Sequence, residues 1–105
     1  MKEARFFLAV RFVIEPAAEA PVLAWLDGGH VAEVLRQPGF LWCRRIKVDA
    51  GGYLMLYGIE SRAAFDKYEA NTELKAKFAR ERAPFEKHMR IERFTGEVEK
   101  SYAAS

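Results

Sequence analysis

The chain is poor in the residues that build disulfides, metal sites and phosphate sites. Its 105 residues include one cysteine, Cys43, and two histidines, His30 and His88. A single cysteine excludes an intramolecular disulfide and a cysteine-rich metal site, and it is consistent with a reducing compartment. The histidines stand far apart without clustered carboxylates, and no glycine-rich phosphate motif is present. We therefore expect no metal site and no bound cofactor.

Long apolar runs and a strong charge of one sign are also missing. No stretch approaches the roughly 20 apolar residues that span a bilayer, and the N-terminal run carries Arg11 and Glu15, unlike a signal peptide. We therefore expect a soluble cytoplasmic protein that does not associate with a membrane. The formal net charge is only +2, and acids interleave with the basic residues of segment 75–93. This pattern is typical of a solvated face, so we do not expect nucleic acid as a partner.

What the chain has in abundance is apolar and aromatic side chains. Hydrophobic residues make up 50% of the sequence, and eight Phe, four Tyr and two Trp are present. This content excludes intrinsic disorder, and the length predicts one domain over residues 1–105. Within it, the polar segment 99–105 is expected to form a flexible tail. Apolar residues in surplus of what a small core can bury are often used against a partner subunit.

The hydrophobic periodicity predicts an ordered series of elements. Alternation with period two predicts strands over residues 5–15, 40–48, 53–60 and 88–98. Helical patterns cover residues 17–37, 62–70 and 73–82. We expect a kink at Gly28 and Gly29, and helix caps at Ser61 and Thr72. The order β-α-β-β-α-β predicts an α+β, ferredoxin-like fold with a four-stranded antiparallel sheet.

The first strand is apolar on both faces, which bears on assembly. Phe6, Leu8 and Phe12 alternate with Phe7 and Ala9. In a ferredoxin-like fold the helices cover one face only, so a monomer would expose an apolar patch of a size that soluble monomers avoid. We therefore predict a homodimer in which two sheets pack face to face. Such a dimeric α+β barrel would enclose a cavity between the sheets.

Two segments resemble a known superfamily. These are Trp25 to Leu35 with the following Pro38-Gly39-Phe40, and Tyr53 to Ser61 leading to Tyr68. They resemble the dimeric α+β barrel superfamily, and most nearly a bacterial group of unknown function classed as DUF4286. EthD-like proteins, antibiotic-biosynthesis monooxygenases and small polyketide cyclases are its relatives. The superfamily holds several activities as well as proteins without a known one, so the resemblance implies a fold and leaves the reaction open.

His30 is the leading candidate for chemistry. It follows the glycine pair and is expected to begin a helical segment, where the positive helix end disfavours an imidazolium. It also resembles the first-helix histidine of EthD-like proteins. The alternative is a structural histidine that hydrogen-bonds a backbone carbonyl. Tyr57 is the second catalytic candidate, because a phenol in a cavity can orient a substrate oxygen or act as an acid, although such tyrosines often serve only the core.

Five more residues are candidates for substrate binding. An arginine that faces an enclosed cavity from a strand must be paired, and it can hold a carboxylate or a phenolate; otherwise it pairs with a nearby glutamate. The residues chosen by their strand faces are Arg44, Arg93, Trp42, Tyr53 and Met55. The sequence thus predicts a homodimer that binds a hydrophobic or aromatic small molecule. One hypothesis is that the protein acts on this molecule without a cofactor, as an isomerase, cyclase, decarboxylase or monooxygenase would. The alternative hypothesis is a non-catalytic interaction or ligand-sensing module with a filled barrel.

Overall fold

A computed structural model describes residues 2–104. Met1 and Ser105, the two ends of the predicted domain, lie outside the described residues. The elements are β1 (Phe6–Ile14), α1 (Pro16–Trp25), the π-helical turn η1 (Leu26–His30), α2 (Val31–Leu35), β2 (Phe40–Lys47), β3 (Tyr53–Ile59), α3 (Arg62–Glu69), α4 (Thr72–Arg82), the 3-10 turn η2 (Ala83–His88) and β4 (Met89–Glu97).

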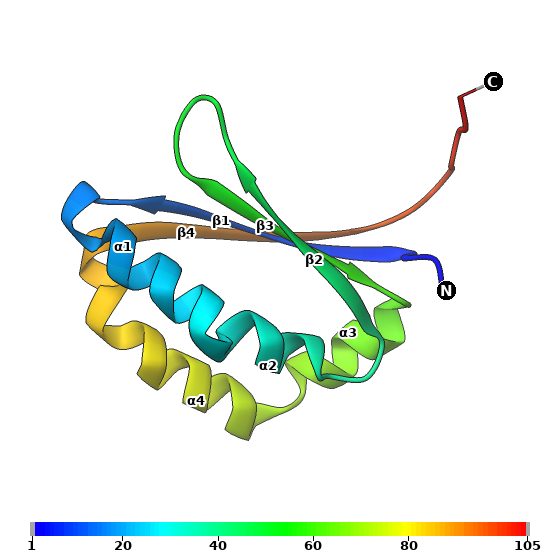
Figure 1. Ribbon diagram of the computed structural model, residues 1–105. Coiled ribbons are helices and arrows are strands. Elements are labelled where there is room, and N and C mark those ends of the chain that lie inside the picture. The colour runs from blue at the N-terminus through cyan, green and yellow to red at the C-terminus, as the bar shows by residue number, and fades with distance from the viewer. Residues whose placement is uncertain (1, 105) are drawn as a thin grey trace.

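The four strands form one antiparallel sheet in the order β2-β3-β1-β4. β1 lies in the middle and pairs with β3 on one side and β4 on the other. All helices lie against one face of this sheet (Figure 1). This order and layering confirm the ferredoxin-like α+β fold that the sequence predicts. Across residues 2–104, no helix has the length and apolar character needed to cross a membrane.

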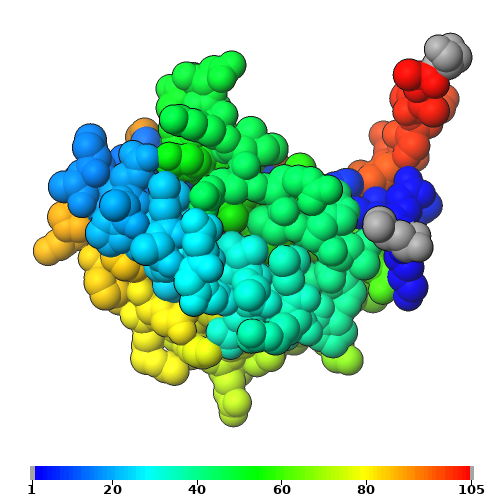
Figure 2. Space-filling view, viewed as in Figure 1, coloured from blue at the N-terminus to red at the C-terminus, as the bar shows by residue number. Residues whose placement is uncertain are grey.

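The core lies between the sheet and the helices. Phe6 of β1 and Ile59 of β3 point toward the helices and have no exposed surface, and Val22 of α1 meets them from the other layer. Figure 2 shows the helical side of the molecule, from which the β2–β3 hairpin projects at one end and the C-terminal segment extends at the other. The residues of this segment, 99–104, are exposed and have no regular secondary structure.

The first helical segment is interrupted at the glycine pair, as the sequence predicts. Gly29 has φ 147°, a backbone conformation that residues with a Cβ rarely adopt. The chain makes a π-helical turn over Leu26–His30 and then continues as α2. Such turns often occur at functional sites. Here the turn places His30 on the side of the helix that faces the sheet.

The two helix caps differ in how well the sequence predicts them. The Ser61 hydroxyl accepts a hydrogen bond from the backbone nitrogen of Ala64 at 3.1 Å, which confirms the first cap. The second prediction was wrong by one residue. Asn71 is the cap of α4, because its Oδ1 accepts from the backbone nitrogen of Leu74 at 3.1 Å, and Thr72 is already helical. Asn and Thr are both good caps, so composition alone does not separate adjacent candidates.

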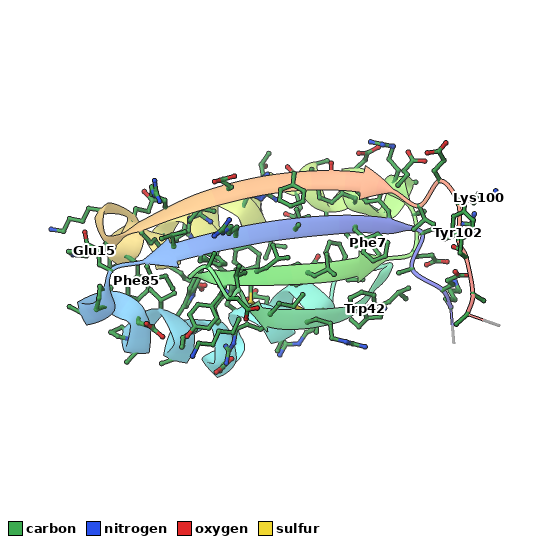
Figure 3. All side chains as sticks on the ribbon, turned by 90° about the horizontal axis from the view of Figure 1, so that it is seen from above. Phe7, Glu15, Trp42, Phe85, Lys100 and Tyr102 are labelled. Carbon is green, nitrogen blue, oxygen red and sulfur yellow. The ribbon has the colours of Figure 1, made fainter. Side chains whose placement is uncertain are left out.

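The uncovered face of the sheet is rich in apolar side chains (Figure 3). Phe7 of β1 packs against Trp42 of β2, with ring centroids 5.8 Å apart, and Trp42 lies across Gly58. Ile46 and Phe94 are 42% and 58% exposed on the strands. A β-bulge lies between Phe40 and Trp42 of β2. Because of it, the Phe40 side chain points toward the helices and the Trp42 side chain points away from them.

Candidate functional site

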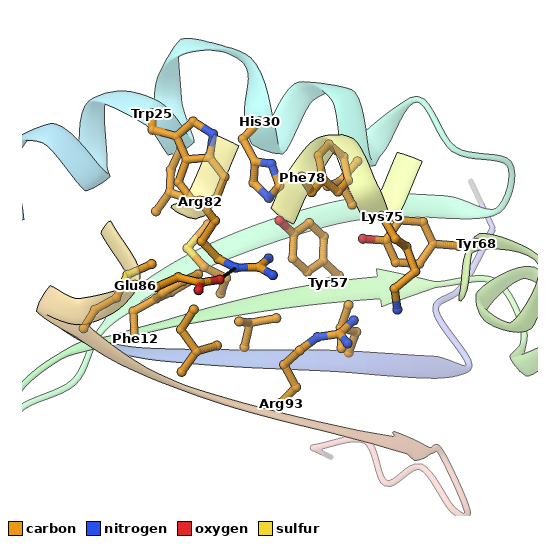
Figure 4. Close-up of a pocket in the computed structure, with 17 residues that line it drawn as sticks. Phe12, Trp25, His30, Tyr57, Tyr68, Lys75, Phe78, Arg82, Glu86 and Arg93 are labelled. Carbon is orange, nitrogen blue, oxygen red and sulfur yellow. Dashed lines mark hydrogen bonds and ion pairs between the residues drawn. The ribbon is translucent and has the colours of Figure 1, made fainter. Parts of the chain in front are cut away.

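A cavity of about 380 Å³ lies between the sheet and the helices, a size typical of small-molecule sites. Figure 4 shows its lining. The side chains come from β1, β3, β4, α1, η1, α2, α3, α4 and η2. They are Leu8, Val10, Phe12, Trp25, Leu26, His30, Val34, Met55, Tyr57, Tyr68, Lys75, Phe78, Arg82, Glu86, Met89, Ile91 and Arg93. A fully packed interior would leave no such space.

His30 stands in the aromatic part of the cavity wall. Its ring stacks on Trp25 with centroids 4.2 Å apart, and it meets Phe78 edge-on at 4.5 Å. Its Nδ1 is buried and has no hydrogen-bond partner among the described residues. The structural alternative from the sequence, a hydrogen bond to a backbone carbonyl, is thus not what this nitrogen makes. A buried ring nitrogen without a hydrogen-bond partner is costly and calls for an explanation.

Burial keeps this imidazole neutral at physiological pH. It lowers the pKa of His30 to about 4, and the neighbouring charges of Glu81, Arg82 and Glu33 modify the value less. The sequence predicts a neutral ring from the positive end of a helix; the physical cause in the structure is loss of hydration instead. Only one ring nitrogen of a neutral imidazole carries a proton, so the other is an acceptor.

Tyr57 faces His30 from the sheet. It is only 3% exposed, and its hydroxyl points toward the His30 ring (Figure 4). Burial raises the pKa of Tyr57 strongly, so it stays a hydrogen-bond donor throughout the physiological range. Cys43, its cross-strand partner, is half-buried, and burial raises the pKa of the Cys43 thiol to about 11. The pair therefore supplies a phenol and a thiol, both protonated.

Cationic side chains surround one part of the cavity. Lys75, Arg82 and Arg93 all belong to the lining. Arg93 donates to Glu69 at 2.9 Å, and Lys75 donates to the other oxygen of the same carboxylate. Burial acts to raise the pKa of Glu69, but the hydrogen bonds from the two cations outweigh it, and the net pKa is lowered. Glu69 is consequently a stable counter-ion at neutral pH.

The structure brings together four of the seven residues predicted for the site. His30, Tyr57, Met55 and Arg93 line the cavity. Tyr53 lies on the same face of β3 but outside the lining, where its hydroxyl donates to Glu19 at 2.5 Å. That hydrogen bond raises the pKa of the Tyr53 phenol.

The other two residues lie on the opposite face of the sheet. Trp42 and Arg44 point away from the helices, with the Arg44 guanidinium 4.6 Å from the centre of the Trp42 ring. The sequence predicts that Trp42 and Arg44 line a cavity between the sheets of two chains. Their role in such a cavity stays a prediction.

Sequence reasoning missed the contribution of α4. It assigned segment 75–93 to a solvated face, whereas Lys75 and Arg82 line the cavity on either side of Phe78. The spacing of these three residues is i, i+3 and i+7, which places them on one side of a helix. An apolar residue between two basic residues on one side of a predicted helix is the sequence signal from which Lys75 and Arg82 could have been predicted. Among residues 2–104, no three His, Cys, Asp or Glu side chains gather as metal ligands would.

No family model matches the sequence, and no curated protein matches it. The resemblance to the DUF4286 group is therefore not confirmed. Solved structures do match. A monooxygenase from the gene ActVA-Orf6 of Streptomyces coelicolor, in complex with nanaomycin D, is 22% identical, covers 97% of this chain and 94% of its own, and superposes with a TM-score of 0.66.

Two further structures have the same fold. A mutant of MhuD with two manganese protoporphyrin IX molecules bound per active site is 18% identical, over 94% of this chain and 99% of that one, with a TM-score of 0.68. A protein described as an antibiotic-biosynthesis monooxygenase, from Bacillus cereus, is 20% identical, over 95% and 99%, with a TM-score of 0.64. The chain thus has the ferredoxin-like fold that these antibiotic-biosynthesis monooxygenase-type proteins share.

Proposed function

We propose that this protein binds a hydrophobic aromatic small molecule in the cavity and converts it without a cofactor, by monooxygenation. The observation that carries the proposal is an aromatic cavity of about 380 Å³ with the neutral imidazole of His30 in its wall. Trp25 and Phe78 provide ring surfaces on either side of that imidazole. The bound molecules of two fold neighbours, nanaomycin D and manganese protoporphyrin IX, are also polycyclic. They support this ligand class by analogy of fold.

The side chains of the cavity have separate roles in this proposal. The neutral imidazole of His30 accepts a proton from a hydroxyl or an activated C–H group of the ligand. Tyr57 donates a hydrogen bond to the ligand oxygen on which negative charge develops. Arg93 supplies a positive charge close by, which favours the ligand anion. The anion of an electron-rich phenol reacts with dioxygen itself: one oxygen atom enters the ring, which is oxidised to the quinone, and the other leaves as water with the two hydrogen atoms that the ligand loses.

We further propose that two chains pair through the uncovered faces of their sheets. Ile46 and Phe94 are exposed there, and Trp42 and Phe7 add to the apolar surface of the same face. Burying that surface against a second copy would stabilise the pair by the hydrophobic effect. In a pair of this kind the cavity of each chain keeps its own wall of helices.

A non-catalytic ligand-sensing module is the second candidate. The observation that favours it is the low pKa of His30, about 4, since a base of that strength removes protons inefficiently at neutral pH. Isomerase, cyclase and decarboxylase chemistry needs the same proton transfers and would be limited in the same way. Turnover of a reactive probe therefore distinguishes binding alone from catalysis.

The test uses 1,5-dihydroxynaphthalene, whose oxygenation by one equivalent of dioxygen gives 5-hydroxy-1,4-naphthoquinone and water, followed by oxygen uptake and product absorbance. Catalysis predicts a rate above background that falls at least about 100-fold in His30→Ala and about 10-fold in Tyr57→Phe, as expected for a lost general base and a lost donor. Arg80→Ala, on an exposed part of α4 outside the cavity, is the matched control. Binding without turnover supports the sensing module, and rates equal in all variants refute the proposed active site.

A further inference from the structure

Basic and aromatic side chains alternate around the cavity. The Arg82 guanidinium lies beneath His30 on one side of Tyr57, and Lys75 lies on the other side (Figure 4). Together with Arg93, these cations come from two elements, α4 and β4. Most of the remaining lining is apolar. A ligand that fills the whole cavity therefore meets apolar and aromatic surface with positive charge beside it.

The charges of this region do not cancel. Lys75 and Arg93 share the single carboxylate of Glu69, and Arg82 pairs with Glu86. Three cations thus face two carboxylates, which leaves a net charge of +1 on these five side chains. In a partly desolvated cavity an uncompensated cation is costly, and a bound anion relieves that cost.

The cations also have donors to spare. Arg82 uses only its Nε for Glu86, at 3.3 Å, and Arg93 uses one terminal nitrogen for Glu69. Among residues 2–104, the two terminal nitrogens of Arg82 donate no hydrogen bond. A guanidinium with both terminal nitrogens available matches the two oxygens of a carboxylate. Side-chain exposures of 33% for Arg82 and 42% for Arg93 place these groups where a ligand enters the cavity.

We infer that the ligand is an aromatic carboxylate, held by its ring against the apolar and aromatic lining beside His30 and by its carboxylate at Arg82, with Lys75 and Arg93 nearby. This inference rests on the proposed function and adds the charge of the ligand to it. It also assigns a specificity-determining role to Arg82. Neutral aromatic molecules of the same shape make the ring contacts but leave the net positive charge of the cavity uncompensated.

The experiment is a calorimetric titration of the full chain with 2-naphthoate and with 2-naphthamide, which has nearly the same shape and no charge. We expect 2-naphthoate to bind at least about ten-fold more tightly, a difference that corresponds to about 1.4 kcal/mol. The preference should shrink when sodium chloride is raised from about 20 mM to about 500 mM, because salt screens the attraction.

Variants assign the preference to named side chains. Arg82→Gln should bring the affinity for 2-naphthoate to within about two-fold of that for 2-naphthamide, and leave the latter unchanged, since a charged hydrogen bond is worth about ten-fold or more in affinity. Lys75→Gln should reduce the preference in part, and it provides a second variant if Arg82→Gln does not fold. Arg80→Gln, exposed on the same helix, is the control and should keep the full preference.

The outcomes separate this inference from the proposed function. If both probes bind equally, the cavity binds aromatic molecules but the carboxylate inference is wrong. It is also wrong if Arg80→Gln lowers the preference as much as Arg82→Gln, because general surface charge would then be the cause. If neither probe binds at millimolar concentration, the proposed function fails and the inference fails with it.

Discussion

The buried imidazole of His30 predicts a specific loss of stability in mild acid. In the folded protein the pKa of His30 is about 4, below the ordinary value of 6.5 that the unfolded chain restores. Between these two values the unfolded chain binds a proton that the folded chain does not. The stabilisation is therefore complete above pH 6.5 and is lost as the pH falls through about 4.

The magnitude follows from the same pKa difference. Each tenfold change in proton affinity corresponds to about 1.4 kcal/mol, and after allowance for the partly exposed ring we expect a loss of about 2 kcal/mol between pH 7.5 and pH 4. Other groups, Glu69 included, also lose stabilisation in acid. Their contribution is common to the wild type and to His30→Phe. The difference between the two proteins thus isolates the imidazole.

Urea unfolding followed by circular dichroism, at half-unit steps of pH, measures this difference. Phe keeps the ring contacts with Trp25 and Phe78 and has no titrating group. Between pH 7.5 and pH 4, the wild type should lose about 2 kcal/mol more of its free energy of unfolding than His30→Phe loses. Stability curves that stay parallel, or an imidazole proton resonance that titrates above pH 6, would refute the reasoning.

The remaining predictions concern packing, capping and the aromatic wall. Gly58→Ala places a Cβ 2.3 Å from the Trp42 ring, so chemical denaturation should show a loss of about 2 kcal/mol. Asn71→Ala should lower the melting temperature through a loss of about 1 kcal/mol, while Thr72→Ala changes it little; the reverse order would contradict the cap. Phe78→Ala should cost about 3 kcal/mol in denaturant and weaken binding of 2-naphthol measured by calorimetry, and unchanged affinity would exclude this ring from the site.

The sequence predicts the fold well because local patterns determine it. Alternating apolar residues mark all four strands, and the glycine pair marks the turn before His30. The position of Phe40 was harder to predict. Its distance of two residues from Trp42 suggests a shared face, but the β-bulge between them places them on opposite faces. A bulge has little signature in a single sequence, since it depends on how the neighbouring strand pairs.

The site is only partly predictable for a related reason. Met55, Tyr57 and Arg93 follow from strand alternation, which tells which residues share a face but not which face the helices cover. Trp42 and Arg44 were chosen by the same rule and lie on the uncovered face. The homodimer, the cytoplasmic location and the catalytic role of His30 stay predictions.

A crystal structure of the protein soaked in 2-naphthol tests the central claim most directly, because it shows where an aromatic molecule binds. We predict electron density for the naphthol ring in the cavity lined by His30 and Phe78, with its hydroxyl near Tyr57. A cavity filled by rearranged side chains, or naphthol bound only beside Trp42 on the uncovered face of the sheet, would contradict it.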